Sequence, residues 1–377
     1  MRSNLDDFLS SLTDRLVFIE IEDESILSRF GDTDSEFMVP VFSKDIVKMA
    51  ADDDAGITTL QIAEAVLYLL GIDSQFKYNA QYVDFIRNNI EKPEILISSL
   101  AKAKYENRNY ADALVFLRAG MLLSDDNKDL IYNYAHICKE YLADTEDREL
   151  KKLFFREAQE FFEAVLDIDE NHVLANYQLS FFKMNLGEPD EAVEHLKKVA
   201  EYSNDNEIAE EAENMIMKLS VREKLEIAEE FIDEMKLEEA LEVLDELPET
   251  TEDKDLSLRM NYARGFCHKA FSEFEEAIEA YEKALLINNT DTLLLCELGI
   301  CYAYIGEFDQ SLEFYLSALD IEPQSTEILS NTAVVYLNMR DIENAKLYIR
   351  KAMEIDPNDE IIESTLKAIR TIEEAEK

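Results

Sequence analysis

A helical-pair pattern returns every 34 residues in the C-terminal part of the chain. Three copies stand in strict register, at Leu258–Asp291, Thr292–Ser325 and Thr326–Asp359. A fixed period of this length indicates a stacked repeat protein, in which each repeat buries its apolar face only against its neighbours. Function in such a protein lies on an extended surface, so a deep enzyme-like pocket is not expected.

Equivalent positions in the copies hold residues of similar size. Positions 8, 20 and 27 are small, and positions 4, 7, 11 and 24 are mostly large. With position 32 added, the second copy has Leu295, Leu298, Gly299, Tyr302, Ser311, Tyr315, Ala318 and Pro323, and the third has Leu329, Thr332, Ala333, Tyr336, Ala345, Ile349, Ala352 and Pro357. The first copy departs from the apolar rule at Asn261 and Arg264. Positions 4, 7, 8 and 11 share a face of the first helix, and the small residues at positions 8 and 20 let the two helices approach closely.

This pattern resembles the tetratricopeptide repeat. The resemblance implies an all-α fold, a right-handed superhelical solenoid of antiparallel helix pairs. Looser copies precede the strict ones, so about seven pairs are expected within 93–359, starting near residues 94, 128, 173, 221, 258, 292 and 326. The pair from 128 is 11 residues longer, around "YLADTEDRELKK", and its helices are expected to project beyond their neighbours. We also expect one extra amphipathic segment at 207–220 and a polar capping helix at 360–377.

The N-terminal region, 1–92, shows no clear repeat. Residues 15–21 and 37–42 alternate or cluster apolar side chains as short strands do, although Pro40 confines the second to a sheet edge. A helical hairpin is expected over 57–90, joined at Gly71. A DNA-reading helix-turn-helix is disfavoured because no basic helix follows. A mostly helical cap with an α+β element is favoured, and a separate effector module stays open.

The composition is strongly acidic. The chain has 83 acidic and 37 basic side chains, a net charge of −46. This charge disfavours nucleic acid and anionic membrane surfaces as partners and favours apolar or basic protein segments. The alternative is a solvated acidic coat without partner preference. The charge does not address self-association, so a homo-oligomer also stays open.

Motifs for catalysis, cofactors and metals are not found. The four histidines have no partner at metal-ligand spacing, and phosphate-binding or nucleophile-elbow motifs are missing. The four cysteines form no Cys-x-x-Cys pair and lie among apolar residues, as reduced core thiols do. No signal peptide or membrane-spanning run is evident. The sequence therefore predicts a non-enzymatic cytoplasmic protein without cofactors.

In tetratricopeptide arrays the first helix of each pair lines a concave groove, through repeat positions 2, 5, 9, 12 and 13. Carried onto this chain, the resemblance implies binding residues that include Tyr132, His136, Tyr177, Phe181, Met184, Arg259, Tyr262, Phe266, Lys269, Ile300, Tyr304, Val334 and Leu337. These positions hold five basic and six acidic residues across the seven pairs, so the groove is near neutral. Their aromatics either anchor a partner segment or pack between layers.

The leading functional interpretation is a scaffold or adaptor that binds a peptide or helix of a partner protein in this groove. The alternatives are a peptide-sensing regulator and a secretion-type chaperone for apolar segments. Some relatives hold a C-terminal carboxylate with basic residues in successive first helices. The matching positions here are Cys296, Ile300, Ser330 and Val334, so that mode of binding is not expected.

Overall fold

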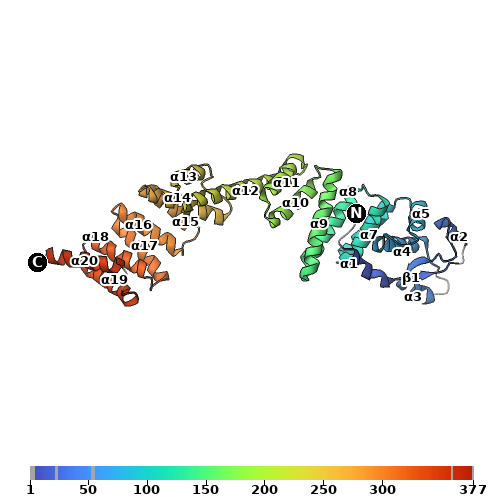
Figure 1. The fold of residues 1–377 in the computed structure, drawn as a ribbon, viewed down its shortest axis with the longest axis horizontal. Coiled ribbons are helices and arrows are strands. Elements are labelled where there is room, and N and C mark those ends of the chain that lie inside the picture. The colour runs from blue at the N-terminus through green and yellow to red at the C-terminus, as the bar shows by residue number, and fades with distance from the viewer. Residues whose placement is uncertain (1–4, 22–23, 52–55, 358–359, 376–377) are drawn as a thin grey trace. The chain divides into compact units, whose positions relative to one another are not determined.

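The computed structural model describes residues 5–21, 24–51, 56–357 and 360–375. They belong to two compact units, Met1–Ile216 and Met217–Lys377 (Figure 1). The elements of the first unit are α1 (Asp6–Ser10), η1 (Ser11–Arg15), β1 (Leu16–Ile19), α2 (Glu24–Leu27), η2 (Ser28–Phe30), β2 (Val39–Phe42), α3 (Ser43–Ala51), α4 (Thr59–Ile72), α5 (Asn79–Asn89), α6 (Pro93–Glu106), α7 (Tyr110–Leu123), α8 (Lys128–Asp144), α9 (Arg148–Ile168), α10 (Val173–Leu186), α11 (Pro189–Tyr202) and the start of α12 (Asn206–Asp233). The second unit continues with α12, followed by α13 (Leu237–Asp245), α14 (Lys254–Ala270), α15 (Phe274–Leu285), α16 (Thr292–Tyr304), α17 (Phe308–Ile321), α18 (Thr326–Asn338), α19 (Ile342–Ile355) and α20 (Glu360–Ala375).

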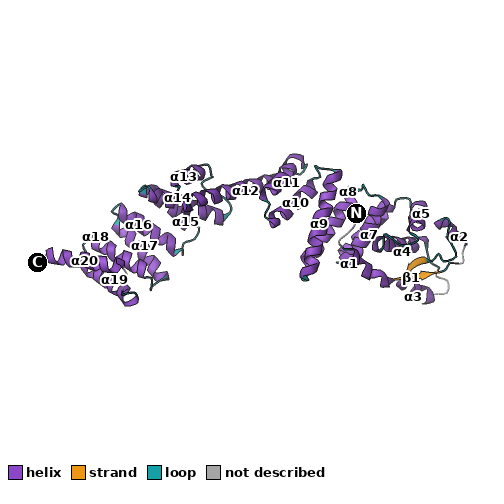
Figure 2. Ribbon diagram, in the orientation of Figure 1, coloured by secondary structure: helices purple, strands orange, loops and turns teal. Residues whose placement is uncertain are grey.

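Helices dominate both units, and consecutive helices pack in pairs (Figure 2). In the first unit α6 packs on α7, α8 on α9 and α10 on α11; in the second α14 packs on α15, α16 on α17 and α18 on α19. Each pair also contacts the next one along the chain within its unit. The predicted fold class, all-α with stacked helix pairs and a small N-terminal region that also holds strands, is confirmed.

The N-terminal region contains the one sheet of the described residues. Strands β1 and β2 pair antiparallel, with Leu16 opposite Phe42 and Ile19 opposite Val39. Pro40 is tolerated because each strand of a two-stranded sheet is an edge. All four residues of β2 are buried, and β2 packs against α4, of which 10 of the 14 residues are buried. Helix α4 begins at a capping box made by Thr58 and Gln61.

Gly71 does not join two helices, contrary to the sequence-based expectation. It lies inside α4, and a Cβ placed on it would come within 1.9 Å of the carbonyl oxygen of Val115 on α7. The glycine therefore permits close contact between α4 and the second helix of the first repeat pair. The chain leaves α4 only after Ile72, and α5 begins at Asn79.

The pair α8 and α9 is longer than its neighbours, at 17 and 21 residues against 14 for both α10 and α11. The N-terminal segment uses part of this extra length. The ring of Phe8 lies 5.8 Å from Tyr141 on α8 and 5.6 Å from Phe154 on α9, measured between centroids. The insertion thus provides a binding surface for α1.

The expected extra segment at 207–220 and the first helix of the pair from 221 form one helix of 28 residues, α12. The reason is local: the run from Glu207 to Asp233 contains no glycine or proline that would end a helix. The boundary between the two units, at Ile216 and Met217, falls inside this helix.

Close contacts between small and aromatic residues hold the second unit together. A Cβ on Gly265 would lie 2.6 Å from the ring of Tyr281, and one on Gly299 would lie 2.8 Å from the ring of Tyr315. Both tyrosines are buried. The repeat pattern predicts this pairing, because positions 8 and 24 meet where the two helices of a pair cross.

The two residues that depart from the apolar rule satisfy backbone groups. Asn261 is buried and donates its side-chain amide to the carbonyl of Ser257 at 2.7 Å. Arg264 donates from Nη2 to the carbonyls of Leu244 and Leu247 at 2.7 and 2.9 Å. Helix α13 has only nine residues, so Arg264 satisfies carbonyls at its C-terminal end that a longer helix would bond internally.

Helix α20 packs on α18 and α19 at the end of the second unit. Ile362 and Ile369 are buried in that contact, and Glu373 is ion-paired with Lys346 of α19. The predicted capping segment extends to 377, and its last two residues lie outside the described part of the chain, as do the last two of the third strict copy.

Candidate functional site

We call the surface formed by repeat positions 2, 5, 9, 12 and 13 of the first helices the first-helix face. It lies on α6, α8 and α10 in the first unit and on α12, α14, α16 and α18 in the second. All 13 predicted binding residues lie on these helices, and none of them is fully buried. Phe181 and Tyr304 are the most exposed, at 36% and 70%.

An aromatic row crosses the first-helix face of the first unit. The rings of Tyr132 and His136 stack with an interplanar angle of 7° and a centroid distance of 6.2 Å. His172 lies 5.3 Å from Tyr132, and Tyr105 lies 6.1 Å from His136. Burial lowers the pKa of both histidines, which favours neutral imidazole rings at neutral pH. Such a row offers π faces to an apolar or a cationic side chain.

Next along the same face, Tyr177 and Phe181 on α10 form an edge-to-face pair with a centroid distance of 5.0 Å. Burial, together with a hydrogen bond to Glu211, raises the pKa of Tyr177 to about 12. The phenol therefore stays protonated and is oriented by α12. Met184, one turn beyond Phe181, is partly exposed. This end of the face combines two aromatic rings with an adaptable thioether.

A shallow pocket of about 320 Å³ opens on the first-helix face between α6 and α8. Its lining consists of Glu94, Ile95, Ser98, Ser99, Lys102, Asn127, Asp129 and Leu130. Ile95, which is 56% exposed, and the buried Leu130 are the apolar residues of the lining, and the other six are polar. The aromatic row thus has a hollow beside it that could take one side chain of a bound segment.

In the second unit, the two basic residues of the predicted site are already paired. Arg259 donates to both carboxylate oxygens of Glu229, at 3.0 Å from Nε and 2.5 Å from Nη2. Lys269 is ion-paired with Glu297, and its Nζ lies 5.5 Å from the ring of Phe266. Their charges are therefore compensated inside the chain, which leaves little free charge for a partner.

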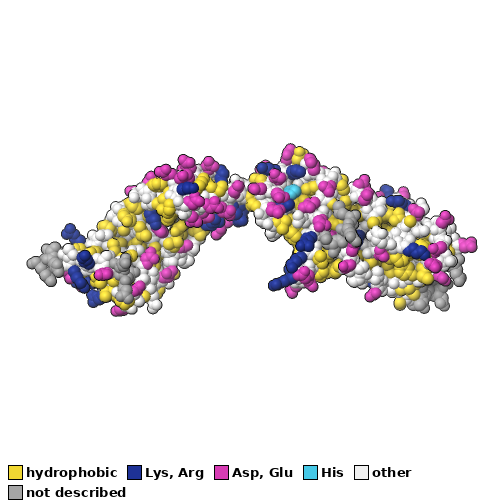
Figure 3. All heavy atoms as spheres, in the orientation of Figure 1, with side chains coloured by type: hydrophobic (Ala, Val, Ile, Leu, Met, Phe, Trp, Pro, Cys, Tyr) yellow, Lys and Arg dark blue, Asp and Glu magenta, His cyan; other side chains and the backbone are white. Residues whose placement is uncertain are grey.

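The remaining predicted residues of the second unit are apolar or aromatic. Tyr262 lies 5.8 Å from Tyr281, and Tyr304 stacks on Phe274 at 4.6 Å with an interplanar angle of 5°. Ile300, Val334 and Leu337 are partly exposed on α16 and α18. Hydrophobic side chains also gather over the second unit in Figure 3, beside acidic ones around α13. The structure thus provides two candidate surfaces, one in each unit.

Metal-binding and redox chemistry are not indicated by the described residues. No three of their His, Cys, Asp and Glu side chains lie close enough together to hold a metal ion. All four cysteines are buried and free, and burial raises the pKa of Cys267 to about 11 and that of Cys296 and Cys301 to about 12. Thiols of this kind are poor nucleophiles at neutral pH.

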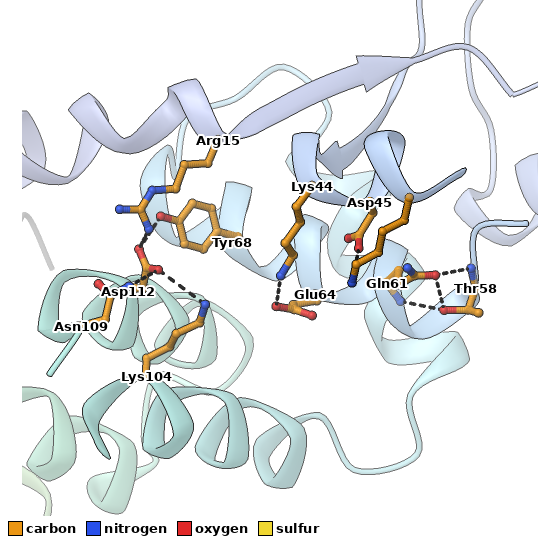
Figure 4. A network of polar contacts seen from close by, with 11 residues as sticks. Arg15, Lys44, Asp45, Thr58, Gln61, Glu64, Tyr68, Lys104, Asn109 and Asp112 are labelled. Atoms are coloured by element: carbon orange, nitrogen blue, oxygen red, sulfur yellow. Dashed lines mark hydrogen bonds and ion pairs between the residues drawn. The ribbon is translucent and has the colours of Figure 1, made fainter. Parts of the chain in front are cut away.

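A polar network that the sequence pattern does not reveal fixes the N-terminal region to the first repeat pair (Figure 4). The carboxylate of Asp112 on α7 is buried and accepts hydrogen bonds from Arg15, from the Tyr68 hydroxyl at 2.7 Å and from Asn109 at 2.7 Å. Lys104 lies 3.5 Å away. Arg15 and Asp112 are 97 residues apart in the sequence, so no local spacing could have indicated the contact.

Sequence comparison identifies the family of these helix pairs. Residues 155–213, 258–291, 294–325 and 326–359 match the family described as Tetratricopeptide repeat. The chain therefore contains tetratricopeptide repeats. Repeats of this family are generally non-catalytic interaction modules. No curated protein matches the sequence closely enough to count as a relative.

Solved structures with similar helix pairs share little sequence with the chain. The Sgt2 TPR domain from Aspergillus fumigatus is 24% identical over 33% of this chain and 83% of that domain, with a TM-score of 0.30. YrrB, described as a TPR protein with an unusual peptide-binding site, is 16% identical over 67% of this chain and 97% of its own, with a TM-score of 0.29. The Yersinia enterocolitica type III secretion chaperone SycD, solved with a peptide of the translocator YopD, is 18% identical over 31% of this chain and 95% of its own, with a TM-score of 0.29. Within the described residues, no helix has the length and apolar character needed to cross a bilayer.

Proposed function

We propose that this protein is a non-catalytic scaffold or adaptor that binds a peptide or helical segment of a partner protein on its first-helix face. The observation that carries the proposal is the exposure and the charge pairing of the predicted residues. Their aromatic and aliphatic side chains stay partly exposed, whereas Arg259 and Lys269 are compensated by Glu229 and Glu297. Partly exposed aromatics beside a pocket are typical anchor sites for a bound segment.

The same observation favours an apolar partner segment over an acidic one. An acidic segment would need free positive charge, and the pairs Arg259–Glu229 and Lys269–Glu297 have none to spare. An apolar segment gains roughly 25 cal/mol for each Å² of apolar surface that it buries. Basic side chains on the segment suit the aromatic row of the first unit, because the rings of Tyr132 and Tyr105 are partly exposed there.

The test replaces exposed face residues singly, as Phe181→Ala and Tyr304→Ala, and compares them with exposed apolar residues off this face, Tyr202→Ala and Leu286→Ala. Tyr202 is 43% exposed and Leu286 is 88% exposed, so the controls remove similar accessible surface. A partner is first captured from the native cell with the wild-type chain and identified, and its affinity for each purified variant is then measured.

We expect the two face variants to bind the partner about tenfold or more weakly, with the melting temperature unchanged within about 2 °C. The control variants should bind like the wild type. If Phe181→Ala and Tyr304→Ala lower the melting temperature by several degrees and leave binding intact, these side chains are packing residues and the proposed surface is wrong.

A cytoplasmic location forms part of the proposal. It is supported by four cysteines that stay as buried free thiols, which suits a reducing compartment. Fractionation of the native cell, with the oxidation state of the thiols determined by mass labelling, tests this location directly. Recovery of the protein in an oxidising compartment would contradict it.

A further inference from the structure

The first half of α9 carries an exposed basic stripe in an otherwise strongly acidic chain. Arg148, Lys151, Lys152 and Arg156 are all exposed. Figure 3 shows Lys and Arg side chains gathered at the end of α9 that projects from its neighbours. Three of them, Arg148, Lys152 and Arg156, follow each other at intervals of four residues and therefore lie along one side of the helix. We call these four residues the α9 stripe.

The length of α9 explains why the stripe is accessible. Phe155 contacts Phe182 of α10 with a centroid distance of 4.7 Å, so this side of α9 faces the next helix pair. Helix α10 has seven residues fewer than α9, at 14 against 21. Arg148, Lys151 and Lys152 precede Phe155 by up to two turns, on the part of α9 that belongs to the insertion.

Few ion pairs within the chain involve the four residues of the α9 stripe. In the described part of the chain, Lys152 alone of the four is in an ion pair, with Glu149 at 2.9 Å. Asp147 caps the first turn of α9 through the backbone amides of Glu149 and Leu150, and Asp144 is 3.6 Å from Arg108. Within the described residues, Arg148, Lys151 and Arg156 are in no ion pair, so their charge is available to a ligand.

We propose that the α9 stripe is a second interaction surface, which binds a short acidic segment of a partner protein. Carboxylates match guanidinium groups in a bidentate geometry, and clusters of arginine recognise acidic motifs in this way. The stripe from Arg148 to Arg156 spans about 12 Å along the helix, which corresponds to two turns of a partner helix with acids at intervals of four residues. The stripe lies on α9, the second helix of its pair, so this surface is distinct from the first-helix face.

Nucleic acid is the other polyanion to consider, and it fits less well. Proteins that hold a nucleic acid backbone commonly make about six to ten phosphate contacts, whereas the stripe provides four basic residues. The chain carries a net charge of −46, which repels a long polyanion more than a short acidic motif that reaches only the stripe. The observations therefore favour an acidic protein segment.

The experiment uses a fluorescent helical peptide with glutamates at positions i, i+4 and i+8 as the probe, and the full-length chain in about 50 mM NaCl. The test variant combines Arg148→Glu, Lys152→Glu and Arg156→Glu. The matched control combines Arg350→Glu, Lys351→Glu and Lys367→Glu, which are exposed residues of the second unit and change the net charge equally. Circular dichroism verifies that both variants keep the helical content of the wild type, and a neutral triple Gln variant of the stripe replaces the test variant if it does not.

We expect the stripe variant to bind the peptide at least about tenfold more weakly than the wild type, and the control to stay within about twofold. Binding should also weaken between 50 and 300 mM NaCl. Equal weakening in both variants, or no binding by the wild type, would overturn the proposal. Tighter binding of a labelled single-stranded oligonucleotide, lost in the stripe variant, would overturn it in favour of nucleic acid.

Discussion

Two sets of helix contacts, one in each unit, are stabilised by different means. In the first unit, the N-terminal region is attached to α7 through the buried carboxylate of Asp112, which gathers hydrogen bonds from Arg15, Tyr68 and Asn109. In the second unit, Gly265 and Gly299 make room for the rings of Tyr281 and Tyr315. The Asp112 network depends on polar groups from distant parts of the sequence, whereas the contact between glycine and tyrosine repeats after 34 residues.

This difference indicates which contacts tolerate change. A ring against a glycine belongs to a side chain, which can move more readily than backbone, and neighbouring repeats provide the same contact again. A buried carboxylate that accepts from several donors is not duplicated elsewhere, and removing it leaves each donor without an acceptor. We therefore expect the first unit to respond more sharply than the second to equivalent substitutions.

The largest effect is expected from Asp112→Ala. The substitution leaves the Tyr68 hydroxyl and the Asn109 amide without their acceptor and should destabilise the first unit by about 3 kcal/mol. Hydrogen exchange followed by mass spectrometry should show loss of protection in α4 and α7, with α14 to α19 unchanged. Asp84→Ala, an exposed acid on α5, is the control and should behave like the wild type. Equal loss of protection in both units would refute the assignment of this network to the first unit.

The next comparison uses one substitution in both units, Gly71→Ala and Gly265→Ala. The new methyl group meets the Val115 carbonyl at 1.9 Å in the first case, and the Tyr281 ring at 2.6 Å in the second. Backbone cannot move without separating α4 from α7, so Gly71→Ala should cost about 3 kcal/mol. For Gly265→Ala, a ring shift and the better helix propensity of alanine should limit the cost to about 1 kcal/mol. Urea unfolding of the two variants measures the difference, and equal costs would show that α4 and α7 can separate easily.

The same contrast explains what the sequence could predict. The Gly265–Tyr281 and Gly299–Tyr315 contacts follow from the repeat, because size alternates at fixed positions. Arg15 and Asp112 are ordinary surface residue types, and only the folded chain brings them together. The sequence cannot tell that Gly71 lies inside a helix, because glycine serves both turns and close helix contacts. The α9 stripe can be recognised from the sequence, since four basic residues at helical spacing are unusual in a chain of charge −46.

For the predicted binding residues, too, the repeat period predicts one part of the arrangement and only the folded chain shows the other. Family spacing places all 13 of them on first helices, where their side chains are at least partly exposed. Spacing could not indicate that Arg259 is held by Glu229 from the preceding pair, or Lys269 by Glu297 from the following one. These partners depend on side-chain conformations, whereas the helix face depends on the period alone.

A smaller effect is a loss of stability at low pH, which is expected mainly in the first unit. Burial lowers the pKa of His136, His172 and His195, all of which belong to that unit. The unfolded chain then binds more protons than the folded one between the folded and unfolded pKa values. Stability from these groups is therefore present above the unfolded pKa, near 6.5, and is lost as the pH falls.

His136→Gln isolates one of these contributions. Burial is the largest cause of the lowered pKa of His136, ahead of the charge of Lys139. The variant should lose less stability than the wild type between pH 7.5 and 5.5, measured by urea unfolding with hydrogen exchange to locate the change. The comparison between variant and wild type removes the general effect of acid on a chain with many carboxylates. Identical pH dependence would show that His136 titrates alike in both states.

The smallest effect is expected to stabilise both units. Arg108 and Arg340 each occupy the left-handed conformation after a first helix, with φ of 57° and 63°, where Gly187 and Gly306 stand in other pairs. Glycine adopts this conformation without a Cβ penalty, so Arg340→Gly should raise stability by about 0.5–1 kcal/mol. Arg108→Gly should gain less, because it also removes a weak exposed ion pair with Asp144. Gly306→Ala is the reciprocal variant and should be destabilised by a similar amount. If thermal unfolding shows both arginine variants below the wild type, contacts of the arginine side chains outweigh the backbone strain at these turns.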